Sequence, residues 1–299
     1  MNKYFRYLLL TKLQKKAAVY DTVKSSLEQK GFKAEDANKP IYGGTISIPG
    51  AKAGIEVKCP NNPIINGKYN VFVQIRPGAG ASSAGINAIL VYCEAGGMAS
   101  AENTREFGNS DWLKKQLGII QTVLSKKFGN VSLGKLAVSS FSGGYQALGN
   151  ILADPTINDK IDSAIILDGI HFGGRNKPDP VGLKPFTDFA NKVKNDPTKK
   201  MVVLHSSVDP GTYASSTTTA NYINQNVGAQ KSKTDKTYNG ITPASISNVG
   251  GYTAIQLFDQ KDPGKLGYGY DEKQQKNQHV QCAKALSQIM SEYLKDWNT

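Results

Sequence analysis

Over most of its length the chain alternates between short apolar runs and longer segments in which apolar residues repeat with a helical period. The runs carry few polar side chains, as strands buried on both faces of a sheet do; they are 88–93, 136–138, 164–167, 201–204 and 253–258. The segments with apolar residues three and four positions apart are 111–128, 145–152, 186–193, 212–227 and 279–297. Strands that alternate with helices form crossover units. The sequence therefore predicts an α/β protein with a mostly parallel central sheet and helices on both faces.

The domain organisation follows from the same pattern. Residues 1 to about 31 have a helical repeat of apolar side chains that stops near Gly31. We therefore expect an N-terminal helical extension over 1–40, packed on or leading into the core, and a single α/β domain over 41–299. A chain of 299 residues is long enough for one large core of this kind.

Other parts of the chain fit less well into the alternation. Shorter β signals at 45–48, 55–58 and 69–75 are punctuated by glycine, and they could supply an antiparallel edge to the sheet. The stretch 230–247 is polar and has little apolar periodicity. This stretch is predicted to be a mobile loop or a lid.

The charge balance bears on binding partners. The formal net charge is +12, but only four of the 36 basic residues are arginine. Proteins that read bases or clamp phosphates depend on the planar fork of arginine, and the lysines here are scattered. We therefore expect a lysine-rich solvated surface and no nucleic-acid partner. The oligomeric state is left open.

Cysteine content and hydropathy indicate the compartment. The three cysteines, Cys59, Cys93 and Cys282, include no C-x-x-C pair, which argues against a disulfide framework and a structural zinc site. The apolar run at 7–10 is too short for a secretory signal, and no stretch has the length of a membrane span. The expectation is a soluble cytoplasmic protein, with non-classical export left open.

One motif carries chemistry. The sequence Ser140-Phe141-Ser142-Gly143-Gly144 lies between a buried strand and an amphipathic helix. A serine on such a tight turn has a strained backbone, so the residues two before and two after it must be small. The turn exposes the hydroxyl at the edge of the sheet, and the following helix directs N–H groups and its positive end toward it. Ser142 is therefore the predicted nucleophile.

At these residues the chain resembles the α/β-hydrolase superfamily of serine esterases and lipases, and the match in element order runs from about Tyr69 onward. The resemblance implies an oxyanion loop after an early strand and a nucleophile at the serine turn. It also implies an acid after a later strand and a histidine before the last helix. The expected fold is the α/β-hydrolase fold.

The oxyanion hole that the resemblance implies has two parts. Gly143 would supply one backbone N–H, directly after the nucleophile. The loop position is occupied by Arg76-Pro77-Gly78-Ala79-Gly80, where many members carry a histidine-glycine pair. The second donor is expected to be the N–H of Ala79 or Gly80 in the loop that begins at Gly78.

The chain has three histidines, and the resemblance assigns them different roles. His279 begins the last helical segment, where the superfamily keeps its general base. His205 directly follows an apolar run and matches a position at which the superfamily has a structural histidine. His171 is predicted to be a loop residue at a strand end that lines the pocket.

Two aspartates compete to orient the base. Asp209 follows the later strand, which is the commoner position in the superfamily, whereas Asp168 follows the strand directly after the elbow helix. Both would lie at the carboxyl edge of the sheet, where ligands of open α/β folds bind. Asp209 is the favoured acid and Asp168 is the alternative.

These roles predict a serine hydrolase that cleaves a carboxylic ester or thioester through a Ser142–His279–Asp209 triad and an acyl-enzyme. No metal cluster, phosphate-binding loop or dinucleotide fingerprint is visible, so we expect no cofactor and no metal. An amidase, peptidase or acyltransferase on the same triad is an alternative. A hydrolase-fold protein that binds a partner without catalysis is another.

Overall fold

The structure is a computed structural model that describes the backbone of 42–47 and the residues 54–60, 62–77, 85–95, 100–258 and 278–298. The predicted N-terminal helix and the whole 1–40 extension lie outside the described residues. The division into an extension and one domain therefore stays a prediction.

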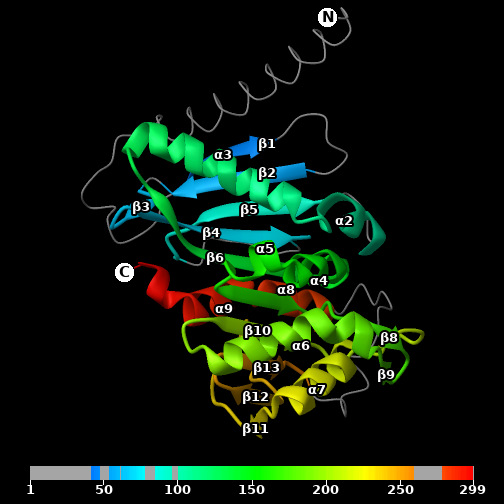
Figure 1. Ribbon diagram of the computed structural model, residues 1–299. Helices are drawn as coiled ribbons and strands as arrows, with labels where there is room; N and C mark the ends of the chain where they lie inside the picture. Colours follow the sequence, from blue (N-terminus) through cyan, green and yellow to red (C-terminus); the bar gives the residue numbers. More distant parts are fainter. Residues whose placement is uncertain are drawn as a thin grey trace, which may run out of the picture.

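A single large sheet runs through the described part of the chain (Figure 1). Its strands are β1 (Tyr42–Ser47), β2 (Gly54–Pro60), β3 (Ile64–Ile65), β4 (Lys68–Ile75), β5 (Ile89–Glu94), β6 (Ser132–Phe141), β7 (Ser163–Leu167), β10 (Lys200–His205), β11 (Gln230–Ser232), β12 (Ser245–Val249) and β13 (Tyr252–Gln256). Their order is β1-β2-β5-β4-β6-β7-β10-β13-β12-β11, with β3 paired to β4 off this path. The six neighbouring strands β5, β4, β6, β7, β10 and β13 are parallel to one another. The strands β2, β12 and β3 pair with them in antiparallel fashion. The predicted fold class, a mostly parallel sheet, is confirmed.

Helices cover both faces of this sheet (Figure 1). One face is covered by α2 (Ser100–Phe107), α3 (Asp111–Phe128), α4 (Tyr145–Ala153), α5 (Pro155–Asn158), α6 (Pro180–Asn195) and α7 (Ser216–Val227). The other face is covered by α8 (Gln278–Lys284), α9 (Leu286–Tyr293) and the short 3-10 helix η4 (Lys295–Asn298).

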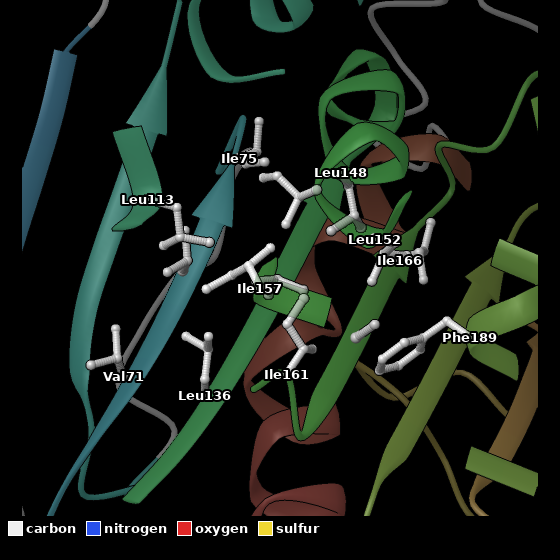
Figure 2. Close-up of a cluster of buried hydrophobic side chains, with 14 of the residues drawn as sticks. Val71, Ile75, Leu113, Leu136, Leu148, Leu152, Ile157, Ile161, Ile166 and Phe189 are labelled. Atoms are coloured by element: carbon white, nitrogen blue, oxygen red, sulfur yellow. The ribbon is translucent and has the colours of Figure 1, made fainter. Parts of the chain in front are cut away.

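The alternation of side chains along each strand creates two separate cores. On β4, Val71, Val73 and Ile75 face the core beneath α3 and α4, and Phe72 faces the core beneath α8 and α9. Figure 2 shows part of the first core, in which aliphatic side chains from β4, β6 and β7 pack against α4 and α5. A parallel sheet with both faces covered has apolar residues at nearly every position, which is why its strands were visible in the sequence as continuous apolar runs.

Helix α3 illustrates how the sequence sets an element's ends. Asp111 lies in its first turn and Lys126 and Lys127 in its last, so these charges oppose the helix dipole. Gly129 follows with a φ of 79°, a conformation that favours glycine, and ends the helix.

The prediction of a mobile loop or lid over 230–247 is wrong at both ends of this stretch, where the chain forms strands. Residues of β11 and β12 extend the sheet beyond β13 as antiparallel strands. Between them Tyr238 is fully buried, and its hydroxyl donates a hydrogen bond to Glu292 of α9 at 3.1 Å. The segment looked like a loop because an edge strand needs few apolar side chains, and the connection is held to α9 by the buried Tyr238 together with polar contacts of Lys236 and Asn239.

The helical elements after His279 end at the edge of the sheet opposite the carboxyl ends of its parallel strands. The side chain of Asn70, early in β4, donates to the carbonyl of Trp297 at 3.0 Å. Asn298 accepts from the N–H of Asn87 at 2.6 Å and donates to the carbonyl of Gly85 at 2.9 Å. The segment α8-α9-η4 therefore spans one face of the sheet and is fastened at its far end. None of the helices in the described ranges has the length and apolar character needed to cross a membrane.

Candidate active site

Ser142 lies on a sharp turn between β6 and α4. Phe141 is extended, and Ser142 has a φ of 49°, so a non-glycine residue is held in the left-handed region. A 3-10 turn over Ser142–Gly144 leads directly into α4. A Cβ on Gly144 would lie 2.8 Å from the carbonyl oxygen of Ile75 and 3.2 Å from the Cβ of Ser140. The steric demand for small residues on both sides of the serine is met as the motif predicts.

The predicted oxyanion hole is only partly within the described structure. Gly143 is buried at the start of the 3-10 turn, where the first N–H groups of a helix lack intrahelical acceptors. Gly78, Ala79 and Gly80 lie outside the described residues. Their role as second donor stays a prediction.

Asp168 follows β7 and is buried against the turn that carries Ser142. It too has a left-handed backbone, with a φ of 43°. A Cβ on the next residue, Gly169, would lie 2.6 Å from the carbonyl oxygen of Ser142, so the aspartate loop packs directly on the backbone of the serine turn. One carboxylate oxygen of Asp168 lies 2.7 Å from Nδ1 of His279.

The other carboxylate oxygen of Asp168 accepts the backbone N–H of Ser206 at 2.9 Å and the hydroxyl of Ser216. Burial by itself raises the pKa of Asp168, but the hydrogen bond and charge of His279, together with these two donors, hold that pKa below its ordinary value. The carboxylate therefore stays ionised inside the protein, where it can orient an imidazole and stabilise it when protonated.

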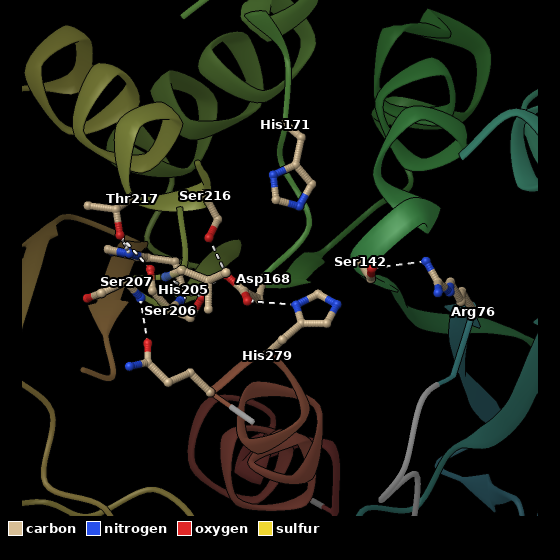
Figure 3. A network of polar contacts seen from close by, with 12 residues as sticks. Arg76, Ser142, Asp168, His171, His205, Ser206, Ser207, Ser216, Thr217 and His279 are labelled. Carbon is tan, nitrogen blue, oxygen red and sulfur yellow. Dashed lines mark hydrogen bonds and ion pairs between the residues drawn. The ribbon is translucent and has the colours of Figure 1, made fainter. Parts of the chain in front are cut away.

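His279 lies at the start of α8, with its ring packed against Phe141 at a centroid separation of 4.5 Å. Figure 3 shows the ring between Asp168 and Ser142, with the nitrogen not bonded to Asp168 on the side of Ser142. The serine and histidine that the sequence paired thus come together from residues far apart in the chain. A hydrogen bond from Nδ1 to Asp168 leaves Nε2 as the atom directed to the serine.

The expectation that Asp209 orients His279 is wrong. The Asp209 side chain is 47% exposed and pairs with Arg175 at 2.7 Å. The chain after β10 keeps Ser206 and Ser207 buried and wraps them around Asp168 and the start of α8, which carries Asp209 past the site. The alternative acid, Asp168, occupies the position beside the histidine.

The two remaining histidines differ in their surroundings. His205 is buried beneath the site, with Nδ1 2.9 Å from the hydroxyl of Thr217, and burial lowers its pKa to about 4. His171 lies apart from the Asp168–His279 pair in Figure 3, with Nδ1 3.1 Å from the carbonyl oxygen of Ala214 and its ring edge-on to Tyr145 and Tyr213. Its Nε2 is buried and has no hydrogen-bond partner among the described atoms. This nitrogen is therefore able to form a hydrogen bond with a substrate.

Sequence reasoning missed one side chain, that of Arg76. This residue directly follows β4, has a φ of 56°, and donates from Nη1 to the hydroxyl oxygen of Ser142 at 2.9 Å. In Figure 3 it reaches Ser142 from the side opposite His279. The available signal was an arginine at the start of the loop to which the resemblance assigns the oxyanion hole, in a chain with only four arginines.

The cysteines are not suited to this chemistry. All three are buried free thiols, and burial raises the pKa of Cys59 to about 12 and that of Cys93 above its usual range. Such thiols stay protonated and are poor nucleophiles. Over the described ranges, no group of three or more histidine, cysteine, aspartate or glutamate side chains is placed to hold a metal ion.

No protein-family model and no curated protein matches the chain. Several solved structures are similar to it. Est1E from Butyrivibrio proteoclasticus is 12% identical, with 85% of this chain and 100% of that chain covered and a TM-score of 0.38. A truncated carbohydrate esterase from gut microbiota is 11% identical, with 90% and 99% covered and a TM-score of 0.41. Prolyl oligopeptidase B from Galerina marginata is 12% identical, with 86% of this chain but 37% of that chain covered and a TM-score of 0.39.

At these identities and TM-scores, the likeness assigns neither a family nor a role to this chain. The chain's own elements agree with the arrangement that the resemblance implied. The serine turn follows β6, the aspartate follows β7, which is the strand directly after the elbow helix, and the histidine begins the last helices. The described elements form a mostly parallel sheet covered by helices on both faces, with a serine, a histidine and an aspartate gathered at its carboxyl edge.

Proposed function

We propose that the protein is a serine hydrolase that cleaves a carboxylic ester or thioester through an acyl-enzyme. Ser142 is the nucleophile, His279 the general base and Asp168 the acid that orients the base. The observation that carries the proposal is the 2.7 Å contact between Asp168 and Nδ1 of His279, with the other ring nitrogen on the side of a strained, buried serine. Sharply constrained serines beside an oriented imidazole are the geometry of acyl transfer.

The reaction follows from these positions. Nε2 of His279 takes the proton of the Ser142 hydroxyl as Oγ forms a bond to the carbonyl carbon, and the carbonyl π pair moves onto oxygen. When the tetrahedral intermediate collapses, the C–O or C–S bond breaks and the leaving group takes the proton from His279. Water then repeats the sequence on the acyl-enzyme, releasing the carboxylic acid and restoring the serine. Asp168 holds the imidazole tautomer and balances its charge during both halves.

Labelling with a fluorophosphonate probe tests the nucleophile. Wild-type protein should be labelled at Ser142, and both Ser142→Ala and His279→Ala should lower hydrolysis of p-nitrophenyl acetate by a factor on the order of 10³ or more. The two losses should be similar in size and should not add in the double variant, because triad members act as a unit. Circular dichroism establishes that the variants are folded.

Ser291→Ala is the matched control, since this serine is exposed on α9. It should keep full labelling and activity. Labelling that persists in Ser142→Ala, or hydrolysis that survives in folded His279→Ala, would refute the triad. If the labelled protein hydrolyses p-nitroanilides faster than matched esters, the enzyme is an amidase instead.

A further inference from the structure

We infer that Arg76 is a catalytic residue of this hydrolase, whose guanidinium donates a charged hydrogen bond to the oxyanion of the tetrahedral intermediate. The inference rests on the proposed function, because it concerns the same serine. Its starting point is the contact from Nη1 of Arg76 to Oγ of Ser142 at 2.9 Å. This is a charged donor directed at the atom that attacks the carbonyl.

The geometry of the intermediate connects this contact to the oxyanion. Once Oγ has attacked, it shares one tetrahedral carbon with the former carbonyl oxygen. A donor already in contact with Oγ therefore reaches the oxyanion after a small shift. Figure 3 places Ser142 between His279 and Arg76. The serine proton leaves on the His279 side. A substrate whose carbonyl oxygen points away from His279 therefore places the developing negative charge beside the guanidinium.

The fold holds Arg76 in this place. Its backbone N–H donates to the carbonyl of Cys93 on the neighbouring strand β5 at 2.7 Å, which fixes the end of β4. Its guanidinium carbon lies 5.8 Å from the centroid of the Phe141 ring, and Phe141 also packs against His279. Preorganised donors of this kind need little rearrangement as the reaction proceeds.

The interaction strengthens along the reaction. In the resting protein the guanidinium faces a neutral hydroxyl, whereas in the intermediate it faces a full negative charge on oxygen. A group that gains in this way lowers the barrier and adds little to substrate binding. Hydrogen bonds between charged partners are also about twice as strong as neutral ones. The contact to Oγ has a second effect, because a lone pair occupied by Arg76 directs the serine's own proton toward His279.

Arg76→Ala tests the inference with two esters of matched length, p-nitrophenyl butyrate and p-nitrophenyl hemisuccinate. Loss of an oxyanion donor should lower kcat for both esters by a factor on the order of 10² to 10³, with little change in KM. Guanidinium chloride, well below denaturing concentrations, should restore part of the activity by occupying the vacated position. The affinity for a trifluoromethyl ketone, which forms a tetrahedral adduct, should fall in proportion to kcat/KM.

The matched control is Arg105→Ala, because Arg105 is an exposed residue of α2 that pairs with its neighbour Glu106. It should retain activity and show no response to guanidinium. If Arg76→Ala only raises the KM for the hemisuccinate, the inference is overturned, and Arg76 instead binds the negative charge of the substrate. Unchanged kcat for both esters, in a protein where Ser142→Ala is inactive, would also overturn it while leaving the proposed function intact. Activity in Ser142→Ala would instead count against the proposed function itself.

Discussion

Asp168 differs from Asp209 in every property that matters to an orienting acid. It is buried, ionised and bonded to His279, whereas Asp209 lies in solvent with Arg175. We expect Asp168→Asn to lower kcat for p-nitrophenyl acetate by a factor on the order of 10³ or more, because an amide can hold the wrong imidazole tautomer. Asp209→Asn should stay within a few-fold of wild type. A larger loss in the Asp209 variant would contradict the assignment.

The choice between these two aspartates could not be made from the sequence. Both follow apolar runs, and both were expected at the same edge of the sheet. What separates them is the path of Ser206 and Ser207, two polar residues that are nevertheless buried because residues distant in the sequence satisfy their polar groups. A pattern of residue types does not reveal such long-range hydrogen bonds, whereas steric and positional demands in the sequence single out Ser142 and His279 as candidates.

At the scale of the elements, the turn between β6 and α4 leaves no room beside Gly144. A Cβ there would lie 2.8 Å from a backbone oxygen that β4 holds in the sheet. Gly144→Ala should therefore destabilise the protein by about 1–3 kcal/mol and reduce hydrolysis by displacing Ser142. Urea unfolding and ester hydrolysis measure the two effects.

Gly118→Ala is the control for that substitution. Gly118 is an exposed residue of α3, and an added Cβ would have no described atom within 4 Å. Alanine there should leave activity unchanged and stabilise the helix by up to about 1 kcal/mol. Equal stability of the two variants would show that the serine turn tolerates a side chain.

The elements themselves were predictable to different degrees. Helix α3 occupies the predicted residues 111–128, because a strong apolar stripe, favourable end charges and a terminal glycine all coincide. The predicted helix over 279–297 is divided into α8, α9 and η4. The sequence does not reveal these breaks, because its apolar periodicity continues across them. The strands β11 and β12 at one end of the sheet were missed because most of their residues are polar.

For the molecule as a whole, His205 makes stability depend on pH. Burial lowers its folded-state pKa to about 4, although the charge of Asp168 opposes this and that of Lys231 adds to it. In the unfolded chain a histidine takes up its proton near pH 6.5. Between about pH 6.5 and 4 the unfolded state therefore binds the extra proton, and the contribution of neutral His205 is lost as the pH falls.

The free energy of unfolding should accordingly drop by up to about 1.4 kcal/mol per pH unit in this window from this group alone. His205→Gln should show a shallower drop between pH 7 and pH 5 in urea titrations. Parallel curves for the variant and the wild type would rule out His205 as the source. The pKa of Asp168 is also lowered, but this group affects the free energy of unfolding only at more acidic pH, because an unfolded aspartate protonates near pH 4.

The fastening of η4 at the far edge of the sheet has a consequence for heat inactivation. His279 is carried at one end of a helical segment whose other end is held by Asn70 and Asn298, while most of the sheet does not depend on that segment for its pairing. If warming releases this fastening first, hydrolysis should disappear, reversibly, several degrees below the temperature at which circular dichroism reports melting. Asn298→Ala should widen that interval without altering the rate at low temperature. A protein arranged in this way would lose its activity before its sheet unfolds, as the end of the segment that carries the base loosens from the side of the sheet remote from the reaction.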